Sequence, residues 1–129
     1  MIQNFTLTID IAIKTLWPHR HEFDAIVCAG DMHAVAIAAA IAKDLNIPFM
    51  AVCAHDHDCV ISHITTFGDV NPTMRYLYVD DFYQFGASRR HTFDYMNQSG
   101  YAPIVATYMA TADSYTHMSI QGEIATIKP

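Results

Sequence analysis

The feature that most constrains the fold is an alternation between apolar runs and helical segments. The runs Phe23–Ala29 and Phe49–Ala54 are apolar almost throughout, and the segment Met32–Leu45 between them is rich in alanine, valine and isoleucine. Strands buried on both faces of a sheet have this composition, because helices cover a parallel sheet from either side. The order therefore predicts a mainly parallel sheet with helices on both faces, which is an α/β fold of three layers.

The boundary residues of the helices are marked by capping and turn signals. Asp31 is placed to cap the helix Met32–Leu45, and Asn46 with Pro48 ends it. A short strand over Asn4–Thr8 is expected before a helix over Ile9–Leu16, which Thr8 caps and a proline ends. A third helix is expected from a serine cap at Ser88 to about Gln98, with a glycine just past its end. The remaining expected strands are Met74–Val79, Ala102–Met109 and Gly122–Ile127.

The segment His55–Thr73 is the least regular part of the chain, with a short strand expected at Cys59–Ile64. It holds histidines and acids that suit a divalent transition metal, among them His55, Asp56 and His57. No standard zinc spacing is present, so a polar loop without a metal is the favoured interpretation.

Length and composition favour a single domain. The 129 residues are 52% apolar and 16% charged, and the net charge of −6 argues against a nonspecific nucleic-acid binder. The three cysteines, Cys28, Cys53 and Cys59, suit a reducing cytoplasm better than a disulfide framework. No signal peptide is recognised at the N-terminus. The apolar stretch Ala25–Ala42 is interpreted as strand, loop and helix rather than as a membrane span, so no membrane partner is expected.

Chemistry is concentrated where the strand Met74–Val79 ends. Two adjacent acids, Asp80 and Asp81, follow the strand, and a short loop leads to Gly86-Ala87-Ser88 at the start of a helix. Adjacent residues at a strand end point in different directions, so each acid can take a different part. Loop amides and a helix N-terminus can hold a phosphate, while carboxylates can hold sugar hydroxyls or a metal. The plain alternative is a pair of strand-end carboxylates before a serine-capped helix.

The run from Met74 to Ser88 resembles the phosphoribosyl-diphosphate (PRPP) motif of the type I phosphoribosyltransferases. In that family a hydrophobic strand meets two acids and a loop that ends in Thr-Gly-Gly-Thr or a close variant. Upstream, Phe23–Val52 resembles the family's first strand, pyrophosphate loop, helix and second strand. Together the resemblance covers roughly Thr8–Met109 and implies the phosphoribosyltransferase fold, with a reduced hood because the part after Met109 is short.

The resemblance also implies a reaction and a set of site residues. Asp80 and Asp81 would be the catalytic acids, holding the ribose hydroxyls and Mg²⁺. The loop near pyrophosphate and magnesium would be Ala29, Gly30 and Asp31. The loop around the 5′-phosphate would be Phe82, Tyr83, Gln84, Phe85, Gly86, Ala87 and Ser88. The implied protein is a cytoplasmic homodimer that binds magnesium PRPP and transfers its phosphoribosyl group to a nitrogenous base with release of pyrophosphate.

Departures from the family pattern keep other functions open. Gln84 and Phe85 stand where the family usually has a polar residue and a threonine, and residues 55–73 contain no lysine or arginine. A non-catalytic nucleotide- or PRPP-binding regulatory domain is therefore the alternative, and a purely structural protein that retains the fold is a third. Tyr78-Val79-Asp80-Asp81 also matches the Tyr-x-Asp-Asp box of reverse transcriptases, but the chain is too short for a polymerase palm with fingers.

Overall fold

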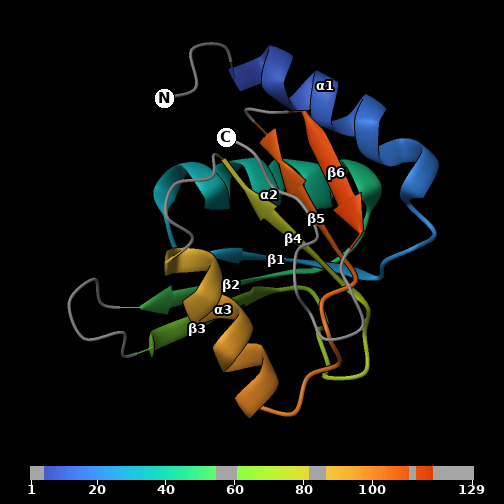
Figure 1. The fold of residues 1–129 in the computed structure, drawn as a ribbon. Coiled ribbons are helices and arrows are strands. Elements are labelled where there is room, and N and C mark those ends of the chain that lie inside the picture. The colour runs from blue at the N-terminus through green and yellow to red at the C-terminus, as the bar shows by residue number, and fades with distance from the viewer. Residues whose placement is uncertain (1–4, 55–60, 82–86, 111–112, 118–129) are drawn as a thin grey trace.

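The structure, a computed structural model, describes residues 5–54, 61–81, 87–110 and 113–117 (Figure 1). Strands and helices alternate through the first half of the chain, as the sequence predicts. In chain order the elements are α1 (Phe5–Leu16), η1 (Trp17–His19), β1 (Ala25–Ala29), α2 (Met32–Leu45), β2 (Phe49–Ala54), β3 (Ile61–Phe67), β4 (Tyr76–Asp80), α3 (Ala87–Gln98), β5 (Ala106–Met109) and β6 (Ser114–His117).

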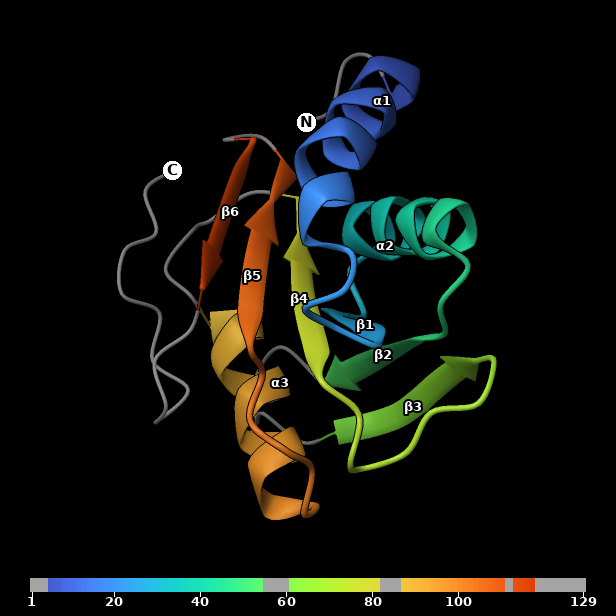
Figure 2. The ribbon, with the colours of Figure 1, turned by 90° about the vertical axis from the view of Figure 1, so that its right-hand side faces the viewer.

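The strands form one sheet in the order β3-β2-β1-β4-β5-β6. β2, β1, β4 and β5 are parallel to one another, whereas β3 and β6 pair antiparallel at the two edges. Figure 2 shows β6 running in the direction opposite to β5. The predicted mainly parallel sheet is confirmed. The chain builds outward from β1 to β2 and then continues on the other side of β1 with β4, so the strand order reverses between β1 and β4. Open α/β sheets bind ligands at such a reversal, beyond the carboxyl ends of the strands.

Helices cover both faces of the sheet (Figure 2). α1 and α2 pack on one face, against buried side chains that include Ile26 and Val79. α3 brings Met96 and Phe93 to the opposite face, where they pack in a cluster with Val27. Neighbouring strand residues such as Ile26 and Val27 point to opposite faces, so each apolar run supplies both cores. The predicted three-layer α/β fold is confirmed.

The first helix begins earlier than predicted. Residues 5–8 belong to α1, so the expected strand is wrong for these residues, and Thr8 lies inside the helix rather than capping it. Ile9, Ala12 and Leu16 are buried at helical spacing, which fixes the face that α1 turns to the sheet. One more helical turn before Ile9 adds backbone hydrogen bonds and leaves that face unchanged. The C-terminal boundary at Leu16 is confirmed.

α2 has the predicted boundaries, Met32–Leu45, and β2 has the predicted range. Asn46 takes the left-handed conformation that ends many helices, with φ of 57°. Asp31 occupies the predicted N-cap position, but its side chain makes no capping hydrogen bond. Its carboxylate is therefore directed elsewhere, which bears on the site described below.

The segment His55–Thr73 is more regular than predicted. β3 (Ile61–Phe67) pairs antiparallel with β2, and Phe67 lies opposite Phe49 with ring centroids 6.4 Å apart. The predicted strand Cys59–Ile64 overlaps β3 but ends three residues too early, and its first two residues lie outside the described part of the chain. An exposed edge strand carries little apolar periodicity, so its limits depend on the backbone of β2. Residues 55–60, which hold most of the candidate metal ligands of this segment, lie outside the described residues.

The C-terminal elements differ in detail from the prediction. α3 begins at Ala87, so Ser88 lies in its first turn rather than before it, while the end at Gln98 is confirmed. Gly100 follows with φ of +80°, the left-handed conformation expected just past a helix. β5 covers only the last part of the predicted strand Ala102–Met109. β6 was not predicted, and the expected strand Gly122–Ile127 lies outside the described residues.

The apolar stretch Ala25–Ala42 divides into β1, a loop and α2, as predicted. Among the described residues, no helix has both the length and the hydropathy needed to cross a bilayer. Cys28 is buried in β1, and Cys53 in β2 is partly exposed; neither takes part in a disulfide in the described part of the chain. The two strands are adjacent, which brings this pair of cysteines near the carboxyl edge of the sheet.

Candidate functional site

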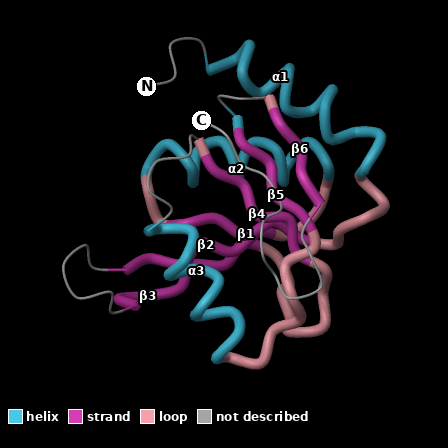
Figure 3. Tube along the Cα trace, in the orientation of Figure 1, coloured by secondary structure: helices cyan, strands magenta, loops and turns pink. Residues whose placement is uncertain are grey.

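The carboxyl ends of β1 and β4 lie side by side at the centre of the sheet, where the strand order reverses. The loop from β1 into α2 contains Gly30 and Asp31, and it is one of the short pink segments in Figure 3. β4 ends at Asp80, and Asp81 follows directly. Because parallel strands deliver their following loops to one edge, two of the predicted site segments meet here.

Asp80 is held by two donors at the end of β4. The Tyr78 hydroxyl donates to Oδ2 of Asp80 at 3.0 Å, and the backbone N–H of Asp81 donates to Oδ1 at 2.8 Å. Burial raises the pKa of Asp80 to about 7, and the neighbouring Asp81 carboxyl adds to the rise. The Tyr78 hydrogen bond opposes this shift because it favours the ionised form. Asp80 is therefore a carboxyl group that two hydrogen bonds hold in place and whose pKa lies near neutral pH.

Asp81 has a different environment from Asp80. Only 7% of its surface is exposed, and its carboxylate lies near Asp31 and His33 from the start of α2. One ligand atom from each of these three residues lies within 4.8 Å of the others. Asp81 thus lies with Asp31 and His33, whereas Asp80 is held by Tyr78 and is not a member of that group, although the two carboxyl groups also hydrogen-bond to each other. The Asp31 carboxylate makes no capping hydrogen bond to α2 and is instead one member of this three-residue group.

Negative charge accumulates at this edge of the sheet. Burial raises the pKa of the Cys28 thiol, and the charges of Asp80, Cys53 and Asp31 raise it further. Three carboxyl groups so close together repel an uncompensated phosphate but favour a divalent cation. Asp31 and Asp81 supply the oxygen ligands that Mg²⁺ prefers, so the residues present fit a magnesium ion. His33 is less suited to Mg²⁺, and Asp80 is not a member of this three-residue group.

The loop after β1 is positioned by a close backbone contact. The Gly30 N–H donates to the Val52 carbonyl at 2.9 Å. A Cβ atom added at Gly30 would lie 2.2 Å from Sγ of Cys53 and 2.9 Å from its Cα, well inside contact distance. Glycine is therefore required here for space. This requirement holds the Gly30–Asp31 loop against β2 and so places Asp31 beside Asp81.

Arg89 brings a positive charge from the first turn of α3. Burial and the Asp80 carboxyl hold the pKa of Tyr78 well above its usual range, and the charge of the Arg89 guanidinium opposes this shift. Ala87 and Ser88 open the same helix. The other predicted phosphate-loop residues, Phe82, Tyr83, Gln84, Phe85 and Gly86, lie outside the described residues.

Two residues of this edge, Tyr78 and His33, were not among the site residues predicted from the sequence. Tyr78 stands two residues before Asp80 on the same strand, so both side chains point to one face. That spacing is the signal that would have linked them. His33 stands two residues after Asp31, at the start of α2, and only the turn after β1 brings both next to Asp81.

No protein-family model matches the chain, and no curated protein sequence is significantly similar to it. Solved structures do resemble it. Orotate phosphoribosyltransferase from Aeropyrum pernix aligns with a TM-score of 0.59 and 19% identity over 75% of this chain. The orotate enzyme from Francisella tularensis aligns with a TM-score of 0.62 and 13% identity over 81%. Purine phosphoribosyltransferase from Pyrococcus horikoshii aligns with a TM-score of 0.63 and 17% identity over 81%.

The chain has the type I phosphoribosyltransferase fold. The predicted fold family is confirmed by these structural likenesses, although the sequences have diverged far. The alignments cover 53% and 50% of the two orotate enzymes and 70% of the purine enzyme. The chain thus spans about half the length of the orotate phosphoribosyltransferases that it resembles. Within the phosphoribosyltransferase fold, Asp80 and Asp81 lie at the carboxyl end of a central strand, beside the loop that follows β1.

Proposed function

We propose that the protein is a phosphoribosyltransferase that binds magnesium PRPP and transfers the phosphoribosyl group to a nitrogenous base. The observation that carries this proposal is the meeting of Asp31, His33 and Asp81 at the carboxyl edge of the sheet, next to Asp80. A phosphoribosyltransferase fold with a group of carboxylates at its strand-order reversal suits a sugar diphosphate with a divalent cation.

The parts of the site divide by chemistry. In the proposal, Asp80 and Asp81 accept hydrogen bonds from the two ribose hydroxyls, and the amides from Phe82 to Ser88 hold the 5′-phosphate. The loop Ala29–Asp31 lies along the pyrophosphate. Asp31 and Asp81 would hold Mg²⁺, and Asp80 remains a proposed ligand. When bound, Mg²⁺ neutralises charge on the pyrophosphate leaving group.

The proposed reaction exchanges one bond at the anomeric carbon of PRPP for another. The bond from that carbon to the pyrophosphate oxygen breaks, and its electron pair leaves with pyrophosphate. A ring nitrogen of the base donates its lone pair to the same carbon, and the nitrogen's proton is released. Positive charge builds up on the ribosyl ring between these events, so the ionised carboxylates near the ring stabilise it. The chain's main contribution is to position the sugar and the base.

The test is calorimetric titration with PRPP, with and without Mg²⁺, followed by measurement of pyrophosphate release across a panel of bases. Asp80→Asn with Asp81→Asn should weaken PRPP binding at least about tenfold, because two charge-assisted hydrogen-bond acceptors are lost. Asp44→Asn, an exposed acid in the last turn of α2, is the control. Equal PRPP affinity in the double variant and the control would reject the site. Absence of PRPP binding in the unmodified protein would reject the function.

A non-catalytic PRPP- or nucleotide-binding regulatory domain is the second candidate. The observation in its favour is the absence of lysine and arginine from residues 55–73, where a cation for pyrophosphate is expected. This candidate predicts magnesium-dependent PRPP binding without pyrophosphate release for any base. The proposed homodimer and the cytoplasmic location are separate expectations, of which the first is checked by sedimentation equilibrium.

A further inference from the structure

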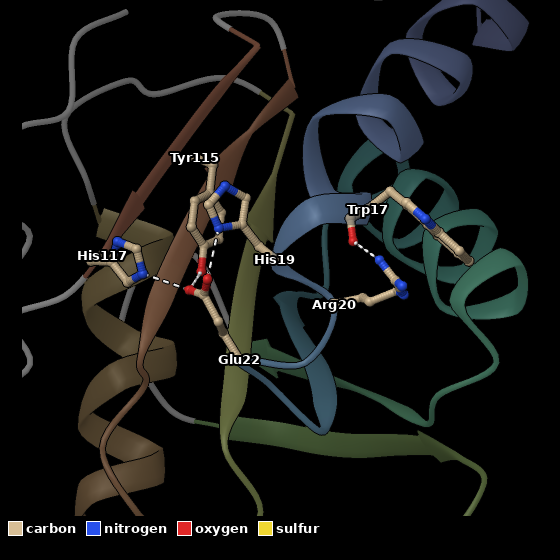
Figure 4. Close-up of polar contacts among 6 residues, drawn as sticks. All are labelled: Trp17, His19, Arg20, Glu22, Tyr115 and His117. Atoms are coloured by element: carbon tan, nitrogen blue, oxygen red, sulfur yellow. Dashed lines mark hydrogen bonds and ion pairs between the residues drawn. The ribbon is translucent and has the colours of Figure 1, made fainter.

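A second group of potential metal ligands lies at the other end of the sheet. His19 at the end of η1, Glu22 in the loop before β1 and His117 at the end of β6 converge on one point (Figure 4). Nδ1 of His19 lies 2.9 Å from Oε2 of Glu22, and Nε2 of His117 lies 2.6 Å from Oε1. Glu22 and His117 are 95 positions apart in the sequence, so only the folded chain forms this group.

The position of the group separates it from the site at the carboxyl ends of β1 and β4. His117 pairs with Ala106, the first residue of β5, whereas Asp80 pairs with Met109, the last residue of that strand. Glu22 precedes β1, and Asp31 follows it. The His19–Glu22–His117 group therefore lies at the amino ends of the parallel strands, and the proposed function does not use it.

The spacing of the ligand atoms suits a small divalent ion. One atom from each of the three residues lies within 4.8 Å of the others. A tetrahedral zinc ion bound at 2.0–2.1 Å places its ligand atoms about 3.3 Å apart. The two hydrogen-bonded contacts end on different oxygens of Glu22, at 2.9 Å and 2.6 Å, and need to open by well under 1 Å to reach that separation. An ion between the two imidazoles would be held by the Glu22 carboxylate in place of both hydrogen bonds.

Tyr115 holds two of the three ligands in place. Its ring stacks on His19 with centroids 4.1 Å apart, and its hydroxyl donates to Oε1 of Glu22 at 2.7 Å. Outer hydrogen-bond partners of this kind orient metal ligands and affect affinity. Glu22 is thus hydrogen-bonded to His19, Tyr115 and His117, and these three contacts hold its carboxylate between the two imidazoles.

We propose that His19, Glu22 and His117 form a binding site for a divalent transition metal, with zinc as the best match, that fastens β6 to the segment between η1 and β1. Two imidazoles with one carboxylate are a ligand set that zinc favours, whereas Mg²⁺ prefers a shell made of oxygen ligands alone. The side chain of His117 is 65% exposed, so the ion reaches the site from solvent.

The test measures Zn²⁺ binding to the full chain by competition with a chromophoric chelator. The double variant His19→Gln/His117→Gln should bind one zinc ion fewer. His117→Gln alone should lower the zinc affinity of the site at least about tenfold, because changes outside the ligand shell already lower affinity about 10–100-fold. Tyr115→Phe keeps the ring and loses only the hydroxyl, so a loss near the lower end of that range is expected. His21→Gln is the matched control, because His21 is exposed in the same loop and is not one of the three ligands.

Two further measurements keep the proposal decidable. Zn²⁺ should raise the melting temperature of the unmodified protein and of His21→Gln, but not that of the double variant. A Co²⁺-loaded sample should show a visible absorption band that His117→Gln diminishes. If the double variant binds the same number of zinc ions with the same affinity as His21→Gln, the proposal is wrong and the group is only a hydrogen-bonded contact. Should His19→Gln prevent folding, the exposed His117→Gln decides alone.

Discussion

The hydroxyl of Tyr78 donates a 3.0 Å hydrogen bond to Oδ2 of Asp80, two residues along the same strand. Tyr78 is fully buried, and its ring packs edge-on against Phe93 of α3. The proposed ribose-binding acid is thus oriented by a residue of the hydrophobic core. The geometry of the proposed site and the packing under α3 are thereby coupled.

Tyr78→Phe should test this coupling. At pH 8 the variant should lose about 1–2 kcal/mol of unfolding free energy, because an ionised carboxylate loses a donor. Since the Tyr78 bond lowers the pKa of Asp80, that pKa should rise in the variant. Carbon-13 NMR of the Asp80 carboxyl group measures the pKa, and urea unfolding measures the stability.

Tyr76→Phe is the control for that variant. Tyr76 is equally buried in β4 and donates to the backbone carbonyl of Asn71 at 2.9 Å. Its loss should cost about 0.5–1.5 kcal/mol, with no difference between pH 5 and pH 8 from this bond. If both tyrosine variants show the same pH dependence, the Tyr78 hydroxyl does not act on Asp80.

Asp80→Asn should make the ligand-free protein less sensitive to pH. Burial raises the folded-state pKa of Asp80 to about 7, against about 3.9 in an unfolded chain. Between these values the folded state binds a proton that the unfolded state does not, so stability falls as pH rises from 4 to 8. Relative to Asp80→Asn, the unmodified protein should lose about 1–3 kcal/mol between pH 5 and pH 8.

Urea unfolding at pH 5 and pH 8, with EDTA present, measures that difference. Asp44→Asn, an exposed acid on α2, should follow the unmodified protein at both pH values. A parallel pH profile for Asp80→Asn and the unmodified protein would show that Asp80 is not a buried, neutral-range group. We expect Asp80→Asn to lose PRPP binding and to gain stability at pH 8. Both results would follow if the ionised Asp80 carboxylate serves binding but destabilises the fold.

Gly30→Ala should disturb the loop that carries Asp31. The added Cβ would lie 2.2 Å from Sγ of Cys53, so either the loop after β1 or strand β2 must move. We expect a loss of about 1–3 kcal/mol, as for other overpacked positions. Cys53→Ala removes the sulfur but leaves Cα and Cβ of residue 53 at 2.9 Å, so it should rescue only part of the loss. A double-mutant cycle by chemical denaturation gives the coupling, and wild-type stability of Gly30→Ala would refute the contact.

Asp24→Asn should weaken the junction between the starts of β1 and β4. Asp24 accepts hydrogen bonds from the Arg75 guanidinium at 2.9 Å and 3.1 Å and from the Arg75 backbone N–H at 2.8 Å. Arg75 lowers the pKa of Asp24. The resulting stability is present above the unfolded pKa near 3.9 and is lost as pH falls through the folded value.

The pair is partly exposed, so the substitution should cost about 0.5–1 kcal/mol at pH 7 and little once the carboxyl group is protonated. Thermal unfolding at pH 7 and at pH 2.5 measures both values. Asp69→Asn, an exposed acid between β3 and β4, is the control and should cost less than Asp24→Asn at pH 7. A cost for Asp24→Asn that does not change with pH would assign the effect to packing rather than to charge.

The sequence was sufficient for the central architecture. Apolar runs around the helix Met32–Leu45 predicted parallel strands, and the boundaries of α2 and β2 were correct to the residue. Strong periodicity and local signals such as Asn46 explain this success, because they act within one turn of the chain. The edge strands β3 and β6 were misplaced or missed, since their short and partly polar segments gain order from pairing with a neighbour.

The candidate sites divide in the same way. The sequence by itself determined that Asp80 and Asp81 end a buried strand and that Asp31 opens the helix after β1, because these positions follow from local pattern. Only the tertiary structure decided that Asp81 joins Asp31 and His33, and that Glu22 lies between His19 and His117. Those meetings depend on strand order and register, which are set by packing and hydrogen bonds between segments far apart in the chain.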